Sequence, residues 1–354
     1  MEELYIELSL IKGLGNKTIK SLLQEYKNPE IIFDSSFDDI SSKFGTHIAN
    51  LILNRDKKLK GKSLKEKEKA EKLGVKIVCL NDKDYPENLK EIPDPPPVIY
   101  VKGKLPVDKN SISFVGTRKY TSYGKFATHK LINELEHINI VSGLAAGIDT
   151  IAHQTALENG NPTTAVLGCG IDIVYPYENY KLYKKIEEEG TIISEFPIGT
   201  KPSKYTFPQR NRIVAGLSYG TVVVEAPKKS GSLITAKLAN EYGRLVFAVP
   251  TNINNPYGEG NNILLKDGAY PLTSGKDIYQ QIPYLERKEI YNLEVELEIS
   301  DLEKKVLELT YEPVHIDYLV QNTGIPLNEI MLILFELEMK DLIINDNGMY
   351  LRNI

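Results

Sequence analysis

The chain has 354 residues, of which 42% are hydrophobic and 26% are charged, and its formal net charge is -5. This composition predicts a soluble globular protein of two or three domains, and it excludes a protein coated in positive charge, so any nucleic-acid contact needs a local basic patch. The acidic first residues do not resemble a signal peptide, and no apolar run approaches the ~20 residues of a membrane helix.

Cysteine and histidine give no sign of a metal site or of a disulfide framework. The two cysteines, Cys79 and Cys169, lack a metal-ligand spacing, and the five histidines are scattered without a zinc-type pairing. Such cysteine usage fits a reducing cytoplasm. We therefore expect a cytoplasmic protein that holds no metal ion.

Residues 1–72 are expected to form a helical domain that ends in a basic linking helix. Residues 8–23 predict two helices around a Gly13-Leu-Gly15 hairpin, and residues 42–49 resemble a weaker second copy. The exposed amides of such a helix-hairpin-helix unit can hold a DNA phosphate, but a packing module that touches no DNA fits a single Gly-x-Gly equally well. Residues 55–72 carry nine basic and four acidic residues, which favours a solvated helix over a DNA-facing one.

Residues 73–285 are expected to form the main domain, a Rossmann-like α/β fold with a parallel sheet. Two short strands, Val75 to Leu80 and Val98 to Val101, flank a proline-rich segment that predicts a rigid extended connection. From residue 112 on, apolar strands alternate with helix-length segments, a pattern typical of a parallel sheet covered on both faces. The expected strands are Ile112 to Val115, Ile138 to Ser142, Thr163 to Leu167, Thr191 to Ser194, Thr221 to Glu225 and Leu245 to Val249.

Small-residue turns follow these strands at the edge of the sheet where ligands of such folds bind. Gly116 and Arg118 follow the first strand, Ser142 to Gly147 follow the second, and Ser230 to Ser232 open a helix after the fifth. Backbone amides at the start of a helix, next to an arginine, suit a phosphate. The sequence has no complete Gly-x-Gly-x-x-Gly and no P-loop motif, so neither a dinucleotide cofactor nor a P-loop ATPase is supported.

A basic loop before the fifth strand combines four cations and two rings without any acid. The cations are Lys201, Lys204, Arg210 and Arg212, and the rings are Tyr205 and Phe207. Cations bind phosphates while unstacked bases lie on rings, so this combination is typical of a site for single-stranded nucleic acid. The alternative is structural: Phe207 packs in the core, and Arg210 or Arg212 pairs with Glu195 or Glu225.

Several segments between Tyr85 and Pro250 carry a family resemblance. They are Tyr85-Pro-Glu-Asn-Leu, Pro95 to Tyr100, Val115-Gly-Thr-Arg118, Ser142 to Asp149, Phe207 to Gly216, Val223 to Ala226, Ser230 to Ala236 and Phe247 to Pro250. Taken in this order, they resemble the bacterial DNA-processing protein A family (DprA, also called Smf), and the resemblance covers essentially the whole chain.

The resemblance implies an extended Rossmann domain that binds single-stranded DNA and dimerises. It also implies that the protein protects incoming strands and loads the recombinase RecA, displacing single-strand-binding protein, during natural transformation. Carried over by position, Arg118, Lys204, Phe207 and Arg210 become the strand-binding pocket, with the turns at Gly143 to Gly147 and Ser230 to Ser232 as its walls.

We therefore predict a nucleic-acid site with no catalytic residue and no cofactor at the carboxyl ends of the strands. Its expected residues are Gly116, Thr117, Arg118, Ser142, Gly143, Ala146, Gly147, Lys201, Lys204, Phe207, Arg210, Asn211, Arg212, Ser230, Gly231 and Ser232. The expected partners are single-stranded DNA, RecA, single-strand-binding protein and a second copy of the chain.

Residues 300–354 predict a winged-helix domain that follows a linker at residues 286–299. Three helical segments, Leu302 to Leu309, His315 to Gln321 and Leu327 to Met339, precede a hairpin pattern from Leu342 to Leu351. The domain holds four basic and ten acidic residues, a surface that repels phosphate. We expect it to contact a protein or to regulate, and not to bind DNA.

A nucleotide sensor or an enzyme is the alternative function. The segment Gly216 to Glu225 is similar to the Gly-Gly-x-Gly-Thr-x-x-Glu turn of phosphoribohydrolases related to lysine-decarboxylase-like proteins, in which an arginine and a glutamate cleave an N-glycosidic bond. Arg118 and Glu225 would match that pair, but Ser218 and Tyr219 stand where the paired glycines belong. We therefore expect Glu225 to order the arginines instead.

Overall fold

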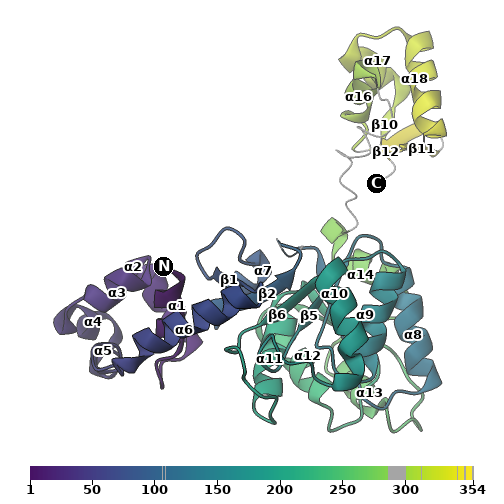
Figure 1. Ribbon diagram of the computed structural model, residues 1–354. Helices are drawn as coiled ribbons and strands as arrows, with labels where there is room; N and C mark the ends of the chain where they lie inside the picture. The colour runs from purple at the N-terminus through teal and green to yellow at the C-terminus, as the bar shows by residue number, and fades with distance from the viewer. Residues whose placement is uncertain are drawn as a thin grey trace. The chain divides into compact units, whose positions relative to one another are not determined.

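Two compact units make up the described part of the chain, Met1–Ile278 and Tyr279–Ile354 (Figure 1). The computed structural model describes residues 1–105, 107, 109–285, 300–311, 313–340, 342–346 and 348–352, and the expected linker at residues 286–299 lies outside them. Each unit has its own hydrophobic core. Among the described helices, none is long and apolar enough to cross a membrane.

Short helices open the first unit. They are α1 (Glu2–Ser9), α2 (Asn16–Tyr26), α3 (Pro29–Asp34), α4 (Phe37–Phe44), α5 (Thr46–Leu53) and α6 (Lys58–Lys72). The expected hairpin lies between α1 and α2. On α6, Leu59, Glu66 and Ala70 are buried, because residues spaced three or four apart share one face of a helix. The linking helix is therefore packed along one face and solvated along the other.

One sheet organises the rest of the first unit, in the order β1-β2-β6-β5-β4-β3-β7-β8-β9. Its strands are β1 (Lys76–Cys79), β2 (Val98–Gly103), β3 (Ser111–Val115), β4 (Asn139–Ser142), β5 (Thr163–Val166), β6 (Thr191–Ser194), β7 (Gly220–Val223), β8 (Leu245–Ala248) and β9 (Tyr270–Pro271). The strands from β3 to β8 form the expected parallel sheet, and β2 extends it because it pairs antiparallel with β6. The proline-rich segment thus connects two strands of the same sheet.

Helices cover both faces of this sheet (Figure 1). They are α7 (Glu87–Glu91), α8 (Ser122–Asn133), α9 (Ile148–Glu158), α10 (Tyr180–Glu189), α11 (Thr206–Gly216), α12 (Gly231–Glu241), α13 (Glu259–Lys266) and α14 (Lys276–Gln281). In the strand order, β4 lies on one side of β3 and β7 on the other, so the crossovers reverse direction at β3. Because crossovers are right-handed, α8, α9 and α10 lie on one face and α11 and α12 on the other. Ligands of such sheets bind at this reversal point, beyond the carboxyl ends of the strands.

The second unit has the expected winged-helix elements. They are α16 (Asp301–Leu307), β10 (Val314–His315), α17 (Ile316–Thr323), α18 (Leu327–Met339), β11 (Ile343–Asp346) and β12 (Met349–Arg352). Ser300 and Glu303 form a reciprocal capping box at the start of α16, and Gly324 ends α17 with a left-handed φ of 72°. The strands form a small antiparallel sheet in the order β10-β12-β11. The core of this unit is built from residues of its own helices and wing, such as Leu319 and Ile330.

Candidate nucleic-acid interface

The turn after β3 places Arg118 at the reversal point of the sheet. The Thr117 amide donates to the carbonyl oxygen of Glu225 at 2.7 Å, which joins this turn to the end of β7. The Lys119 amide donates to the Thr117 hydroxyl at 3.1 Å and tightens the turn further. Thr117 is buried by these contacts, whereas Arg118 is exposed. The backbone is thus fixed while the guanidinium is free to meet a ligand.

The turn after β4 packs against the same backbone. Gly147 has a φ of 93°, and a Cβ at this position would lie 2.3 Å from the Thr117 carbonyl oxygen and 2.6 Å from the Arg118 Cα. A glycine is required there both by conformation and by the close approach of the second turn. At Gly116, a Cβ would lie 2.5 Å from Ile148 at the start of α9. These two glycines let the turns after β3 and β4 lie in contact.

Only part of the turn after β4 reaches the surface. The Ser142 hydroxyl donates to the Phe114 carbonyl at 2.6 Å, and the buried Asp149 carboxylate accepts from the Gly143 amide at 3.1 Å. Burial raises the pKa of the Asp149 carboxyl. Ser142 and Gly143 were expected to face DNA, but both are buried and shape the turn, whereas Ala146 is exposed.

Phe207 lies beside Arg118, on the first turn of α11. The guanidinium carbon of Arg118 is 5.7 Å from the centre of the Phe207 ring, within cation–π range. The centre of the Tyr175 ring is 5.4 Å from the centre of the Phe207 ring. A Cβ at Gly168 would lie only 2.7 Å from the Phe207 ring. Phe207 is half-buried. The structure thus brings together the cation and the ring that the sequence singled out.

Arg210 is placed differently from the prediction. It is 5% exposed, and its guanidinium donates to the carbonyl oxygens of Gly143 and Val166. The predicted basic loop is helical from Thr206 on, and the helical period turns Arg210 toward the sheet, on the same side as Phe207. Arg210 is therefore not exposed in this structure, and its guanidinium supports the turn after β4.

Arg212 is buried as well. Its guanidinium forms an ion pair with Glu195 and donates to the backbone carbonyl of Asp94 at 2.7 Å. Burial raises the pKa of the Glu195 carboxyl. The structure therefore shows the alternative that the sequence offered for Arg212, a pairing with Glu195, and not an exposed cation.

The remaining cations of the edge are exposed. Lys201 and Lys204 precede α11, Lys119 follows Arg118, and Lys229 lies in the turn after β7. Within the part of the chain that the structure describes, none of these four lysines forms an ion pair. Sequence reasoning did not select Lys119 and Lys229, although both lie in turns that it had identified. At the carboxyl ends of the strands, the exposed positive charge of this surface is therefore carried by Arg118 and these four lysines.

The start of α12 forms the border of this surface. Ser230 caps the helix by accepting from the Ser232 amide at 3.3 Å, and the Asn211 side chain of α11 donates to the Gly231 carbonyl at 3.4 Å. Gly231 is exposed and has open space around its Cα. The positive end of a helix thus faces the same edge as the lysines.

Glu225 does not order the arginines, contrary to the expectation. Its carboxylate accepts from the Thr121 amide at 2.8 Å and from the Thr121 hydroxyl at 2.7 Å, and it also accepts from the Asn255 side chain at 3.2 Å. Thr121 in turn caps α8 by accepting from the Gly124 amide. Both carboxylate oxygens are thus used to hold the start of α8.

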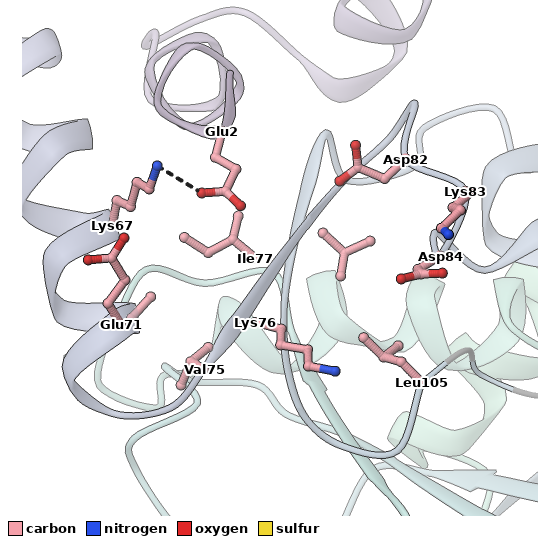
Figure 2. A pocket seen from close by; sticks show the side chains of 12 residues that line it. Glu2, Lys67, Glu71, Val75, Lys76, Ile77, Asp82, Lys83, Asp84 and Leu105 are labelled. Atoms are coloured by element: carbon pink, nitrogen blue, oxygen red, sulfur yellow. Dashed lines mark ion pairs between the residues drawn. The ribbon is translucent and has the colours of Figure 1, made fainter.

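A hollow in the described structure lies away from the candidate interface. The hollow in Figure 2 has a volume of about 460 Å³ and lies near β1, an edge strand of the sheet, with lining residues from α1 and α6. Lys67 on α6 forms an ion pair with Glu2 on α1 at 3.3 Å. Its lining mixes acids and lysines. Over the described residues, no group of histidine, cysteine or acidic side chains is arranged to hold a metal ion.

Two family models match the chain. The model of DNA recombination-mediator protein A matches residues 76–283, and that of the DprA winged helix domain matches residues 295–349. The chain is 33% identical to Protein Smf of Synechocystis sp. over 98% of this chain and 97% of that protein.

Solved structures give the same assignment. The X-ray structure of DNA processing protein A from Streptococcus pneumoniae aligns with a TM-score of 0.65 and 35% identity, over 78% of this chain and 95% of that one. A Helicobacter pylori DNA processing protein A, whose structure addresses its single-stranded DNA binding mode, aligns with a TM-score of 0.54 and 30% identity over 59% and 96%. From these matches, the chain belongs to the DNA recombination-mediator protein A (DprA/Smf) family.

Proposed function

We propose that this chain is a non-catalytic, cytoplasmic single-stranded DNA-binding protein that protects the strand and loads RecA onto it during natural transformation. The observation that carries the proposal is the pairing of Arg118 with Phe207 at the reversal point of the sheet, ringed by exposed lysines. A phosphate can lie against the guanidinium while the neighbouring base stacks on the ring. Neither contact reads base edges, so sequence preference is low.

The preference for single-stranded over double-stranded DNA follows from the position of the Phe207 ring. Phe207 is half-buried, and a base can reach it only when that base is unpaired from its complement. A gel-shift comparison of single- and double-stranded oligonucleotides over a salt series tests this. Single strands should bind more tightly at every salt concentration, and equal binding of both forms would contradict the proposal.

Salt dependence measures the phosphate contacts. Neutralising the three exposed predicted cations, Arg118, Lys201 and Lys204, gives a log-log slope of about -2, and adding Lys119 and Lys229 brings it to roughly -3.5. A slope near zero would rule out a charge-driven site.

Loading of RecA is supported by membership of the family. It is tested by adding the protein to RecA and a strand coated with single-strand-binding protein. RecA should start to hydrolyse ATP sooner with the protein than without it, and light scattering on the same sample measures the proposed homodimer.

The non-catalytic part of the proposal is supported by Glu225. A general acid or base must be free to exchange a proton with a substrate, whereas this carboxylate holds Thr121 and Asn255. Incubation of the purified protein with nucleoside monophosphates should release no free base, and turnover would favour the phosphoribohydrolase-like alternative.

A further inference from the structure

Exposed tyrosines continue the surface around Phe207. Tyr175 is 40% exposed, Tyr177 75% and Tyr180 43%. Tyrosine rings favour sites where one face is covered by a partner, because they bury a large apolar area at low entropy cost. Three such rings lie within six residues and next to the candidate strand site. A ligand with flat apolar faces could cover them.

The rings form two pairs that follow one another. Tyr175 packs against Phe207, with ring centres 5.4 Å apart and planes tilted by 39°. Tyr177 packs against Tyr180, with ring centres 5.7 Å apart and planes tilted by 31°. A single residue, Pro176, separates Tyr175 from Tyr177 in the chain. The two ring pairs therefore follow one another along the chain, beginning with the pair that contains Phe207.

The short helix that carries Tyr177 is hydrogen-bonded to the turn after β4. Between Tyr177 and Tyr180, the Asn179 side chain donates to the Leu144 carbonyl at 2.9 Å and to the Thr150 hydroxyl at 2.9 Å. These contacts anchor the short helix at Tyr177–Asn179 beside the turn that supports Arg118. The backbone that carries the rings is thus fixed before any ligand binds, which lowers the entropy cost of binding.

The charged residues within three positions of the tyrosines carry no excess of positive charge. Glu178 and Lys181 are exposed neighbours of opposite sign, and Asp172 accepts from the Gly199 amide at 2.8 Å. This part of the surface therefore offers stacking without a net attraction for phosphate, unlike the region around Arg118.

We propose that Tyr175, Tyr177 and Tyr180 form a second base-stacking platform for the same single strand that Arg118 and Phe207 hold. The strand leaves the reversal point of the sheet, passes the end of β5 and runs over the start of α10 (Figure 1). Every base has a flat face, so the platform accepts any sequence and lengthens the bound strand. This inference rests on the proposed function of the Arg118–Phe207 site.

Fluorescence anisotropy of full-length protein with labelled oligothymidylates of about 4 to 20 nucleotides tests the platform. Tyr177→Ala should weaken binding of the longer strands roughly five- to hundredfold, while the shortest strands that bind keep their affinity. Tyr177→Phe should behave as the wild type, because it keeps the ring. The matched control is Tyr318→Ala, an exposed tyrosine of the other unit, which should change nothing.

The salt slope of Tyr177→Ala should equal that of the wild type, since a ring carries no charge. Equal affinity of Tyr177→Ala and wild type at every length would overturn the platform while leaving the Arg118 site intact. A change in mass by light scattering without a change in strand affinity would also overturn it and assign the rings to self-association. If the wild type binds no oligonucleotide of any length, the proposed function itself fails.

Discussion

Arg118 stands out among the arginines of the edge because its guanidinium remains exposed. Arg210 and Arg212 follow it in the predicted set, yet both are buried and bonded to carbonyl or carboxylate oxygens. Turning either guanidinium outward would break these bonds and leave buried oxygen atoms without a partner, which opposes a phosphate contact from Arg210 or Arg212. The strand-binding charge at this point of the sheet therefore depends on one arginine.

Replacing that arginine is the first prediction. Arg118→Ala should weaken single-strand binding ten- to a hundredfold, about 1.4 to 2.7 kcal/mol, because it removes both a phosphate contact and the stack on Phe207. Anisotropy with a labelled oligonucleotide measures it, and the salt slope should become shallower by roughly 0.7. Lys125→Ala, an exposed lysine on α8, serves as the control for the loss of one charge.

Phe207→Ala gives the complementary result. Affinity should fall by a similar factor while the salt slope stays that of the wild type, because the ring contributes stacking and not charge. Circular dichroism verifies that α11 is still folded. If both variants bind as tightly as the wild type, the strand site lies elsewhere.

A side chain at Gly147 should disturb the backbone that presents Arg118. In Gly147→Ala, the new methyl group meets the Thr117 carbonyl and the Arg118 Cα, so the turn that presents Arg118 must shift. We expect a loss of about 1 to 3 kcal/mol in the free energy of unfolding by urea, together with weaker strand binding. Gly160→Ala is the matched control: Gly160 has a φ of 75° but open space around it, so it shares the strain without the clash.

The helix α11 is an element whose first half the sequence analysis took as a loop. The apolar strands were predicted to within two residues, because a strand buried on both faces leaves a continuous apolar run. The meeting of Arg118 and Phe207 was expected from the family resemblance, which carried both residues over to one strand-binding pocket. The segment from Lys201 to Arg212, however, contains two prolines and no apolar period, so its helical part was taken as a loop.

That misassignment explains why Arg210 and Arg212 were expected at the surface. A loop would have left Arg210 and Arg212 free, whereas a helix fixes the direction in which each side chain leaves the backbone. The partners of those side chains, the carbonyls of Gly143 and Val166 and the carboxylate of Glu195, come from distant parts of the sequence. Local patterns do not contain such pairings. The role of Glu225 was missed for the same reason, since its partner Thr121 belongs to the first turn of another helix.

The helix α18 explains why the second unit should not bind the strand. Its outward side chains include Met331, Leu332 and Phe335, each 57% to 61% exposed, and Glu329 and Glu336 are exposed on the same helix. No cation stands among them to meet a phosphate. Removal of residues 300–354 should therefore leave single-strand affinity within twofold of the full-length value, as measured by anisotropy. A larger loss would place part of the DNA site in the second unit.

For the whole molecule, acid stability depends on a buried histidine. His153 on α9 is fully buried with its Nδ1 2.7 Å from the Thr163 hydroxyl, and burial lowers its pKa to about 3. An unfolded histidine titrates near 6.5, so below that pH the unfolded chain gains a proton that the folded chain does not take up. Stability is therefore full above pH 6.5 and falls as the pH drops, by about 2 kcal/mol at pH 5.

Urea unfolding of the wild type and of His153→Gln at several pH values between 5 and 7 measures this. The buried carboxyls of Asp149 and Glu195, whose pKa values are raised, act in the opposite direction in both proteins, so the difference between the two curves isolates His153. Parallel curves would contradict the assignment.

The two separate cores have a consequence for how this protein can change over evolutionary time. A substitution inside one core leaves the packing free energy of the other untouched, because effects at distant sites add. The acidic unit can therefore change its surface to suit a new partner without loss of packing in the sheet domain.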